Sequence, residues 1–208
     1  MGRILAVSDV HGHGPLLLQL LRAAHYDAEC DRLYILGDWV NKGPDSLGTL
    51  NIVQQLISRG ALGILGNNER KWLDEIPTDL GLAEQEQVEI QHWLAELPLW
   101  AEDGEYLFVH AGLRPGIPLE RQTATDLTEI RGEFFNSPPL EAYTVVFGHT
   151  PTFRLGASAG RIWLGPGKIG VDTGAGHGSC LSLVDLTNRC QYAIDVAAPN
   201  QVHCYTDW

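Results

Sequence analysis

The sequence has few of the features that mark membrane-bound or secreted proteins. None of its apolar runs approaches the roughly 20 residues that a transmembrane helix needs. Asp9 and His11 interrupt the first apolar run, which is too early for a signal peptide. Met1-Gly2 could begin a myristoylation signal, but Ala6 stands where that signal needs serine or threonine. We therefore expect a cytoplasmic protein without a membrane partner.

Cysteine and positive charge are also scarce. The four cysteines form no C-x-x-C pair and no close cluster with histidine, so the spacing favours separate thiols over a disulfide framework. A pair between Cys190 and Cys204 stays open. The 14 lysine and arginine residues are outnumbered by 26 aspartate and glutamate residues, for a net charge of −12. Nucleic-acid binding needs clustered lysine and arginine, so no nucleic-acid partner is expected.

The 208 residues are enough for one domain with a sizeable core, and we expect a single domain over residues 1–208. Its first part alternates short apolar runs with helical patterns. This order predicts a parallel sheet with right-handed crossovers. The successive strands and helices are expected at Arg3–Val7, Pro15–Tyr26, Leu33–Leu36, Pro44–Ser58 and Ala61–Leu65.

The second part of the chain has a different pattern. Residues 77–97 contain a strongly helical, polar stretch without motif residues, which predicts an inserted cap beside the site, with Trp93 as a packing residue. Asp103-Gly104 predicts a tight hairpin turn. Short, antiparallel strands are expected at Thr152–Leu155, Arg161–Leu164, Ile169–Asp172, Cys180–Leu186 and Gln191–Val196, with a turn at Thr187-Asn188. Together the patterns predict an α/β protein, a mixed β-sandwich flanked by helices.

Polar side chains follow five of the apolar strands, at the point where each strand ends. Open α/β sheets place their functional sites at the carboxyl ends of strands. The residues at these ends offer oxygen and nitrogen ligands that suit Mn, Fe or Zn better than a soft metal. The candidate ligands are Asp9, His11, Asp38, Asn67, His110 and His149.

These residues lie in an ordered set of motifs. The set consists of Asp9-x-His11-Gly12, Gly37-Asp38-x-x-x-Lys42-Gly43, Gly66-Asn67-x-Glu69, His110-Ala111-Gly112 and Gly148-His149-Thr150. It resembles the calcineurin-like metallophosphoesterases, and more narrowly the phosphoprotein phosphatase (PPP) family with its bacterial members, which include the symmetrical diadenosine tetraphosphatases. The resemblance extends from Ile4 to about Ala175. It implies a four-layer αββα fold.

The resemblance also implies two divalent metal ions, which we expect to be manganese, with iron or zinc as alternatives. A bridging carboxylate can bind one ion with each oxygen, and we expect Asp38 to fill this role. By resemblance, two residues complete the first site and three complete the second: Asp9 and His11, then Asn67, His110 and His149. A metal-bridging hydroxide would then attack phosphorus in line.

Cationic side chains are needed to hold the phosphate, because its charge spreads over three equatorial oxygens. Lys42 stands where the family usually has an arginine. Lysine keeps the positive charge but cannot bind phosphate through the two parallel hydrogen bonds of a guanidinium. Arg131, in Ile130–Phe134, matches the place of a second family arginine, which lies in a helix between the two histidine motifs. Arg114 is a weaker alternative clamp.

The chain departs from the family pattern at the general acid. Similar proteins have a histidine after the ligand asparagine and an aspartate that acts with it, and here those positions hold Asn68 and Asn41. An amide has no proton to donate near pH 7, although the two could hydrogen-bond to each other. His177, on a glycine-rich loop, is a candidate replacement acid, and His13 is a weaker one.

The sequence favours a dinuclear-metal phosphomonoesterase acting on phosphoproteins, as a Ser/Thr or Tyr phosphatase, or on small phosphate esters. Two alternatives stay open. A symmetrical dinucleoside polyphosphate hydrolase would need further basic residues for its extra phosphates. A degenerate phosphatase that only binds phosphorylated partners is supported by Asn68 and Asn41, and the complete set of six metal positions argues against it.

Overall fold

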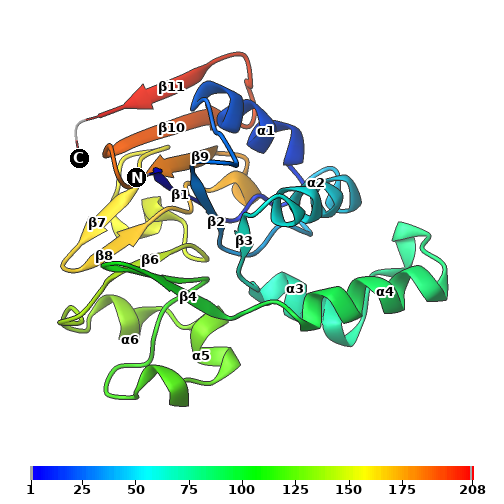
Figure 1. Ribbon diagram of the computed structural model, residues 1–208, viewed down its shortest axis with the longest axis horizontal. Helices are drawn as coiled ribbons and strands as arrows, with labels where there is room; N and C mark the ends of the chain where they lie inside the picture. Colours follow the sequence, from blue (N-terminus) through cyan, green and yellow to red (C-terminus); the bar gives the residue numbers. More distant parts are fainter. Residues whose placement is uncertain (1, 207) are drawn as a thin grey trace.

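The computed structural model describes residues 2–206 and 208, and its core consists of two mixed β-sheets (Figure 1). The six-stranded sheet has the order β11-β10-β9-β1-β2-β3 and the five-stranded sheet the order β4-β5-β6-β8-β7. The first comprises β1 (Ile4–Val7), β2 (Arg32–Ile35), β3 (Leu62–Gly63), β9 (Cys180–Asp185), β10 (Cys190–Asp195) and β11 (Val202–Tyr205). The second comprises β4 (Trp100–Asp103), β5 (Tyr106–Val109), β6 (Thr144–Phe147), β7 (Trp163–Gly165) and β8 (Lys168–Gly170).

The two sheets pack face to face because their central strands are apolar on both sides. Successive side chains of a strand point to opposite faces. In β1, Leu5 and Val7 pack against the helices, whereas Ile4 and Ala6 join Phe108 of the other sheet in a separate cluster. The short runs without a polar face therefore encode strands that are buried on both sides.

Helices cover the outer face of each sheet (Figure 1). Next to the six-stranded sheet lie α1 (Gly14–Ala23) and α2 (Ser46–Ser58), and next to the five-stranded sheet lie α5 (Ala124–Glu129) and α6 (Gly132–Phe135). The result is the predicted four-layer αββα arrangement, a mixed sandwich flanked by helices. No helix within residues 2–206 is long and apolar enough to cross a membrane.

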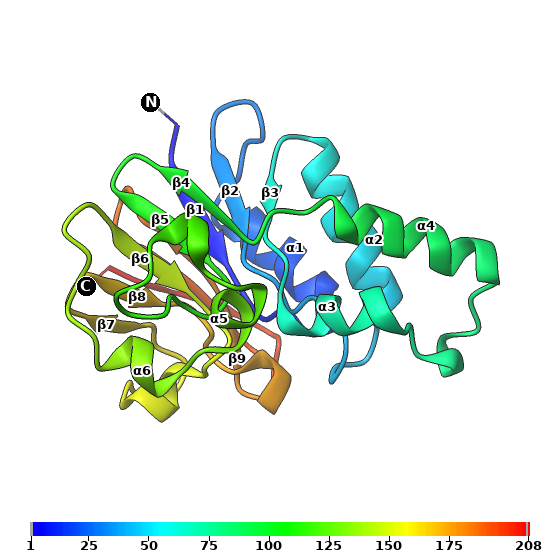
Figure 2. The same cartoon turned by 90° about the horizontal axis from the view of Figure 1, so that it is seen from below.

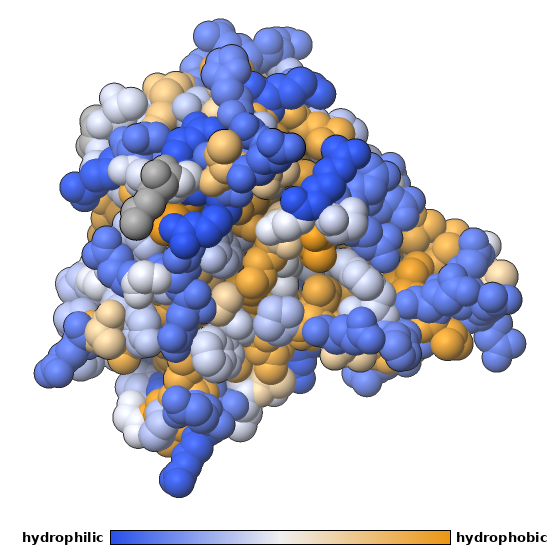
Figure 3. Space-filling view, in the orientation of Figure 1, coloured by the Kyte–Doolittle hydropathy of each residue, from blue (hydrophilic) through white to orange (hydrophobic). Residues whose placement is uncertain are grey.

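The region predicted as a cap, residues 77–97, contains a 3-10 turn, η1 (Thr78–Leu80), and α4 (Glu84–Ala95). Together with α3 (Asn67–Asp74), α4 forms an arm that extends away from the sheets (Figure 2). Figure 3 shows hydrophobic side chains among the hydrophilic ones on this arm. At its base, the Trp93 ring centroid lies 6.0 Å from that of Trp39, the residue after Asp38, so the arm packs directly behind a candidate metal ligand.

The prediction differs from the structure on three points in the second half of the chain. Residues Thr152–Leu155 form a 3-10 turn, η3, rather than a strand, because Pro151 opens the turn and Gly156, at φ +91°, closes it. The last strand, β11 (Val202–Tyr205), was not predicted. It pairs only with β10 at the sheet edge, and its sequence lacks an apolar run. The last strands are also not all antiparallel, since β8 pairs with β6 in parallel.

Cys190 and Cys204 lie side by side on β10 and β11, with their Sγ atoms 2.7 Å apart. The strand register pairs Cys204 with Tyr192, two residues after Cys190, so the two thiols share one face as diagonal neighbours. Cys30 is exposed and has no such partner thiol among the described residues. The structure therefore brings the two thiols that the sequence left open as a pair into contact, and both are free cysteines.

Because these two thiols are in contact, mild oxidation should join them. With oxidised glutathione, the two thiols should lose two protons and two electrons and reduce the reagent to two glutathione thiols. Peptide mapping without reductant should find the Cys190–Cys204 link in wild-type protein and in Cys30→Ser, but not in Cys204→Ser. Glutathione adducts in place of this link would contradict the prediction.

Candidate metal centre

Loops at the carboxyl ends of five strands, β1, β2, β3, β5 and β6, bring the candidate ligands together. The loop after β1 is fastened to the loop after β2, since the backbone N–H groups of Asp9 and His11 donate to the carbonyls of Gly37 and Asp38, at 3.0 and 2.9 Å. After β6, the N–H of Gly148 donates to the carbonyl of His110, which follows β5, at 2.8 Å. These bonds fix the loop geometry before any side chain contributes.

Asp9, His11 and Asp38 form the first group of possible metal ligands. All three are buried, and the Nε2 of His11 lies 3.6 Å from a carboxylate oxygen of each aspartate. The Nδ1 of His11 lies 3.0 Å from the carbonyl oxygen of Val40, to which it can only donate. Nδ1 therefore carries a proton, and Nε2, which faces both aspartates, is the nitrogen that would bind a metal.

Asp38 also belongs to the second group, with His110 and His149. The Nδ1 of His110 donates to the Leu36 carbonyl at 2.6 Å, which leaves its Nε2 lone pair 3.4 Å from an oxygen of Asp38. The Oδ1 atom of Asn67 lies 3.1 Å from this Nε2 and 2.9 Å from the Nδ1 of His149. The predicted ligands of the second site thus converge, and Asp38 is common to both groups.

The backbone is strained where these ligands sit. Eight non-glycine residues with positive φ lie in the part of the chain that the structure describes, and six of them belong to the site. These are Asp9, His11, Asp38, Asn41, Lys42 and His149, with φ between +43° and +65°. Left-handed geometry costs about 1–3 kcal/mol at a non-glycine residue, so the surrounding contacts must over-determine it.

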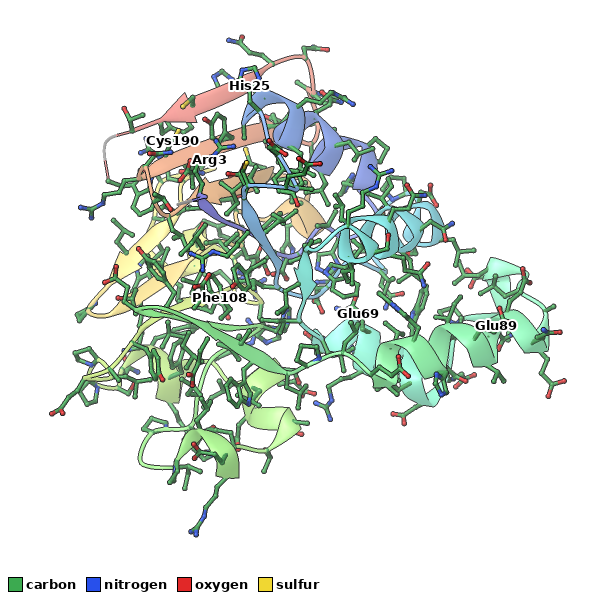
Figure 4. The ribbon with its side chains drawn as sticks, in the orientation of Figure 1. Arg3, His25, Glu69, Glu89, Phe108 and Cys190 are labelled. Carbon is green, nitrogen blue, oxygen red and sulfur yellow. The ribbon has the colours of Figure 1, made fainter. Side chains whose placement is uncertain are left out.

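The buried carboxylate of Glu69 supplies the strongest of these contacts. It accepts four backbone N–H groups, from Asp38, Trp39, Val40 and Gly66, at 2.7 to 3.2 Å. Figure 4 shows Glu69 at the start of α3. Burial and the nearby Asp38 charge raise the pKa of Glu69 to about 7, whereas the N–H groups oppose this shift. The sequence analysis gave Glu69 no role, although a glutamate three residues after the N-cap Gly66 can accept from that backbone N–H, which is one half of a capping box.

Two glycines allow the loops to approach this closely. A Cβ on Gly66 would collide with the backbone nitrogen and a carboxylate oxygen of Asp38. A Cβ on Gly176 would collide with the ring of His11, so the turn η4 (Ala175–His177) lies directly against the first ligand group. The glycine requirement therefore comes from contact between loops.

The electrostatics of the site favour bound cations. Although burial opposes its protonation, Asp9 and Asp38 raise the pKa of His11 to about 9. Burial and the charge of Asp9 raise the pKa of Asp172, a further buried carboxyl, well above its usual range. Both shifts show negative charge that nearby side chains do not balance. Carboxylate, amide and imidazole donors with fixed tautomers fit divalent metals in both groups.

Asn68 and Asn41 are linked in a chain of amide hydrogen bonds. Asn68 donates from its Nδ2 to Asp38 at 2.5 Å and accepts at its Oδ1 from the Nδ2 of Asn41 at 3.0 Å. The Oδ1 of Asn41 accepts from the indole N–H of Trp72 at 3.1 Å. The pair therefore holds the loops after β2 and β3 together, in the contact that the sequence analysis considered.

The three candidate clamps differ in their surroundings. The Nζ of Lys42 lies 3.0 Å from the Nε2 of His11, at the first group. Arg131 precedes α6 rather than lying within a helix, and its guanidinium donates at 3.1 Å to Thr150, next to His149. Arg114 forms ion pairs at 2.6 and 2.7 Å with Asp126 and Glu133. Those two carboxylates neutralise Arg114, which favours a structural role over a phosphate clamp.

The two candidate acids lie near the first group. His177 is an exposed residue. The partial burial of its ring is the largest cause of its lowered pKa, and the charges of Lys42 and Arg154 are the next largest. Burial and the charge of His11 lower the pKa of His13. Both shifts favour neutral imidazole at pH 7, which weakens either residue as a proton donor.

The comparison with protein families agrees with this geometry. The profile described as calcineurin-like phosphoesterase matches residues 2–174. The chain belongs to this family. Family membership supports metal-dependent phosphoesterase chemistry at the two ligand groups, and the identity of the metal stays a prediction.

Curated proteins are similar to part of this chain. Two of them, from Dechloromonas aromatica (strain RCB) and Vibrio parahaemolyticus serotype O3:K6 (strain RIMD 2210633), are each named symmetrical bis(5'-nucleosyl)-tetraphosphatase. Both are 34% identical to this chain, over 122 and 136 residues. The matches cover 53% and 60% of this chain but only 44% and 50% of the relatives. The matched part thus corresponds to about half the length of these curated relatives.

Solved structures extend the similarity to the whole fold. A protein named as a candidate diadenosine tetraphosphatase superimposes with a TM-score of 0.75 at 29% identity, over 96% of this chain and 95% of that one. A protein-tyrosine phosphatase from Shewanella sp. gives 0.66 at 17% identity, over 98% of this chain and 80% of that one. The second likeness concerns the fold alone.

The role of Glu69 leads to a mutational prediction. Glu69→Gln should lower the free energy of unfolding by about 2–3 kcal/mol, because a glutamine amide cannot accept four charge-assisted bonds. It should also weaken Mn²⁺ binding, since the loop that carries Asp38 loses its anchor. Urea denaturation and metal titration measure the two effects. Glu89→Gln, on the exposed side of α4, is the matched control, and equal behaviour of both variants would contradict the role.

Proposed function

We propose that this protein is a metal-dependent hydrolase of phosphoanhydrides, with dinucleoside polyphosphates as the substrate class. Asp9, His11 and Asp38 would hold one divalent ion, and the second group around Asp38 would hold another. Bound divalent ions would supply Lewis acidity and a nucleophile at neutral pH. The relatives named symmetrical tetraphosphatases support this reading over the phosphoprotein phosphatase that the sequence favoured.

The observation that carries the proposal is the amide chain at Asn68 and Asn41. The resemblance assigns the general acid to this place, and an amide cannot protonate a leaving oxygen. A substrate is then cleaved well only if its leaving group carries negative charge unaided. Phosphate oxygens have a pKa near 6, a phenol such as tyrosine has one near 10, and aliphatic hydroxyls are far more basic.

Symmetrical cleavage of a dinucleoside tetraphosphate fits this condition. Breaking the central P–O–P link expels a nucleoside diphosphate, whose leaving oxygen belongs to a phosphate. Serine and threonine phosphates would instead expel an alkoxide, and their turnover would suffer most from the missing acid. Tyrosine phosphate lies between the two, and aryl phosphates are therefore the second candidate substrates.

A polyphosphate needs several cations, and the side chains around the site offer them. Arg131 lies beside the second group through its bond to Thr150. Lys42 lies at the first group. Burial is the largest cause of the lowered pKa of His177, and the charges of Lys42 and Arg154 come next, so both cations lie close to that ring. We assign the phosphates next to the scissile bond to the two cations Lys42 and Arg154, with the neutral imidazole of His177 beside them. These two basic side chains are not adjacent in sequence.

The proposal predicts an order of substrates. With Mn²⁺, kcat/KM should fall from diadenosine tetraphosphate through p-nitrophenyl phosphate to a phosphoserine peptide, and the tetraphosphate should yield ADP. The double variant Asn68→His with Asn41→Asp should raise phosphoserine turnover by about 10²-fold, because a general acid typically increases the rate by about 10²–10⁴-fold. The same variant should change tetraphosphate turnover little. Equal rates on all three substrates, or no turnover with intact metal binding, would contradict the proposal.

Charge reversal tests the clamp. Arg131→Glu should reduce kcat/KM by at least about 10²-fold while metal content is unchanged, because it repels phosphate without replacing a ligand. Arg121→Glu, at an exposed turn, is the matched control for charge and should retain activity. Steady-state kinetics together with metal analysis of the purified variants measures the difference. Unchanged kinetics for Arg131→Glu would exclude its role.

A further inference from the structure

A cavity of about 400 Å³ lies on the outer side of the five-stranded sheet, and none of the candidate metal ligands lines it. Its inner wall is apolar and includes Leu107, Leu113, Phe134 and Val145. Two loops, residues 113–119 and 137–143, and Lys168 of β8 complete the lining. The volume lies within the range of about 300–1,000 Å³ that is common for small-molecule sites.

One charged side chain in the lining is buried. Lys168 of β8 is only 3% exposed, and its Nζ lies 5.3 Å from the ring centroid of Phe134. The Nζ donates to the carbonyl of Ser137 at 2.7 Å, and Ser137 also lines the cavity. An ammonium has three donors, and no carboxylate within residues 2–206 forms an ion pair with this one. A buried cation without an anion is costly, so the cavity contains an unmet demand for negative charge.

The other charged residues of the lining do not meet this demand. Arg114 is already paired with Asp126 and Glu133. Glu141 is exposed on the outer loop, where water screens its charge. Burial lowers the pKa of Lys168, and an anion bound beside it would oppose that shift.

We propose that this cavity binds a small aliphatic carboxylate. The carboxylate would accept from the Nζ of Lys168, and the hydrocarbon chain would pack against Leu107, Leu113 and Val145. A phosphate or nucleotide fits poorly, because Lys168 is the one lining cation without an ion-pair partner among the described residues and the inner wall around it is apolar. The site is separate from the hydrolase centre and does not depend on the proposed substrate.

The mouth of the cavity supports an apolar ligand. Ile117 and Leu140, one from each loop, are 42% and 44% exposed, which is unusual for large hydrophobic side chains that face the same opening. Prolines in both loops restrict the backbone, so the opening is largely pre-formed and binding orders little further chain. The prolines are Pro115, Pro118, Pro138 and Pro139.

Calorimetric titration of the full chain with octanoate and with octan-1-ol tests the proposal. Wild-type protein should bind octanoate at least about 10-fold more tightly than the alcohol, because only the acid pairs with Lys168. Lys168→Met should remove this preference and leave octanol binding in place. Lys71→Met, an exposed lysine of α3, is the matched control and should behave as wild type.

A second variant keeps the test decisive if Lys168→Met does not fold. Ile117→Glu changes an exposed side chain at the mouth, and it should weaken octanoate at least 10-fold by like-charge repulsion while the fold is retained. Equal affinity of wild-type protein for octanoate and octanol would overturn the proposal. So would the absence of octanoate binding, or binding that neither variant alters. Turnover of the hydrolase substrates is a separate readout, so either proposal can fail alone.

Discussion

The structure of the site depends on one buried carboxylate that binds backbone rather than metal. Glu69 gathers four N–H groups from two loops, and this fixes the turn that carries Asp38. A buried anion is tolerated only where hydrogen bonds satisfy it, so Glu69 and the loops stabilise each other. Asp38, 31 residues earlier, accepts hydrogen bonds from Asn68 and directs its negative charge toward the two ligand groups. Glu69 thus holds the loops together, and Asp38 is the carboxylate that can bind ions.

The same contacts explain how a strained backbone persists. Residues such as Asp9, Asn41 and Lys42 adopt left-handed geometry at a cost, and each lies in a loop that is fastened to a neighbouring loop. The rigid sandwich underneath supplies the stability for this, since both faces of its central strands are buried. Ligands pre-organised in this way need little rearrangement when ions bind, which favours tight and geometrically selective binding.

The chemistry that we propose depends on two amides, Asn68 and Asn41, at the place where the family resemblance puts the general acid and its partner. The two form a hydrogen-bonded pair, and an amide has no proton to donate near pH 7. An enzyme built this way depends on its substrate for a stable leaving group, and phosphoanhydrides provide one. The cations Lys42 and Arg131, one near each ligand group, suit a substrate whose charge extends beyond a single phosphate.

The sequence by itself predicted the alternating strands and the polar residues at their carboxyl ends, because both follow from local patterns, whereas the four-layer order and the ligand set came with the family resemblance. Features that depend on contacts between residues far apart in the sequence were decided only by the tertiary structure. The sequence left Arg114 open as a weaker alternative to Arg131, and the structure shows that Asp126 and Glu133 neutralise it. The edge strand β11 lacks an apolar run of its own. The role of Glu69 required knowing which backbone groups lie around it, and chain folding alone brings those groups together.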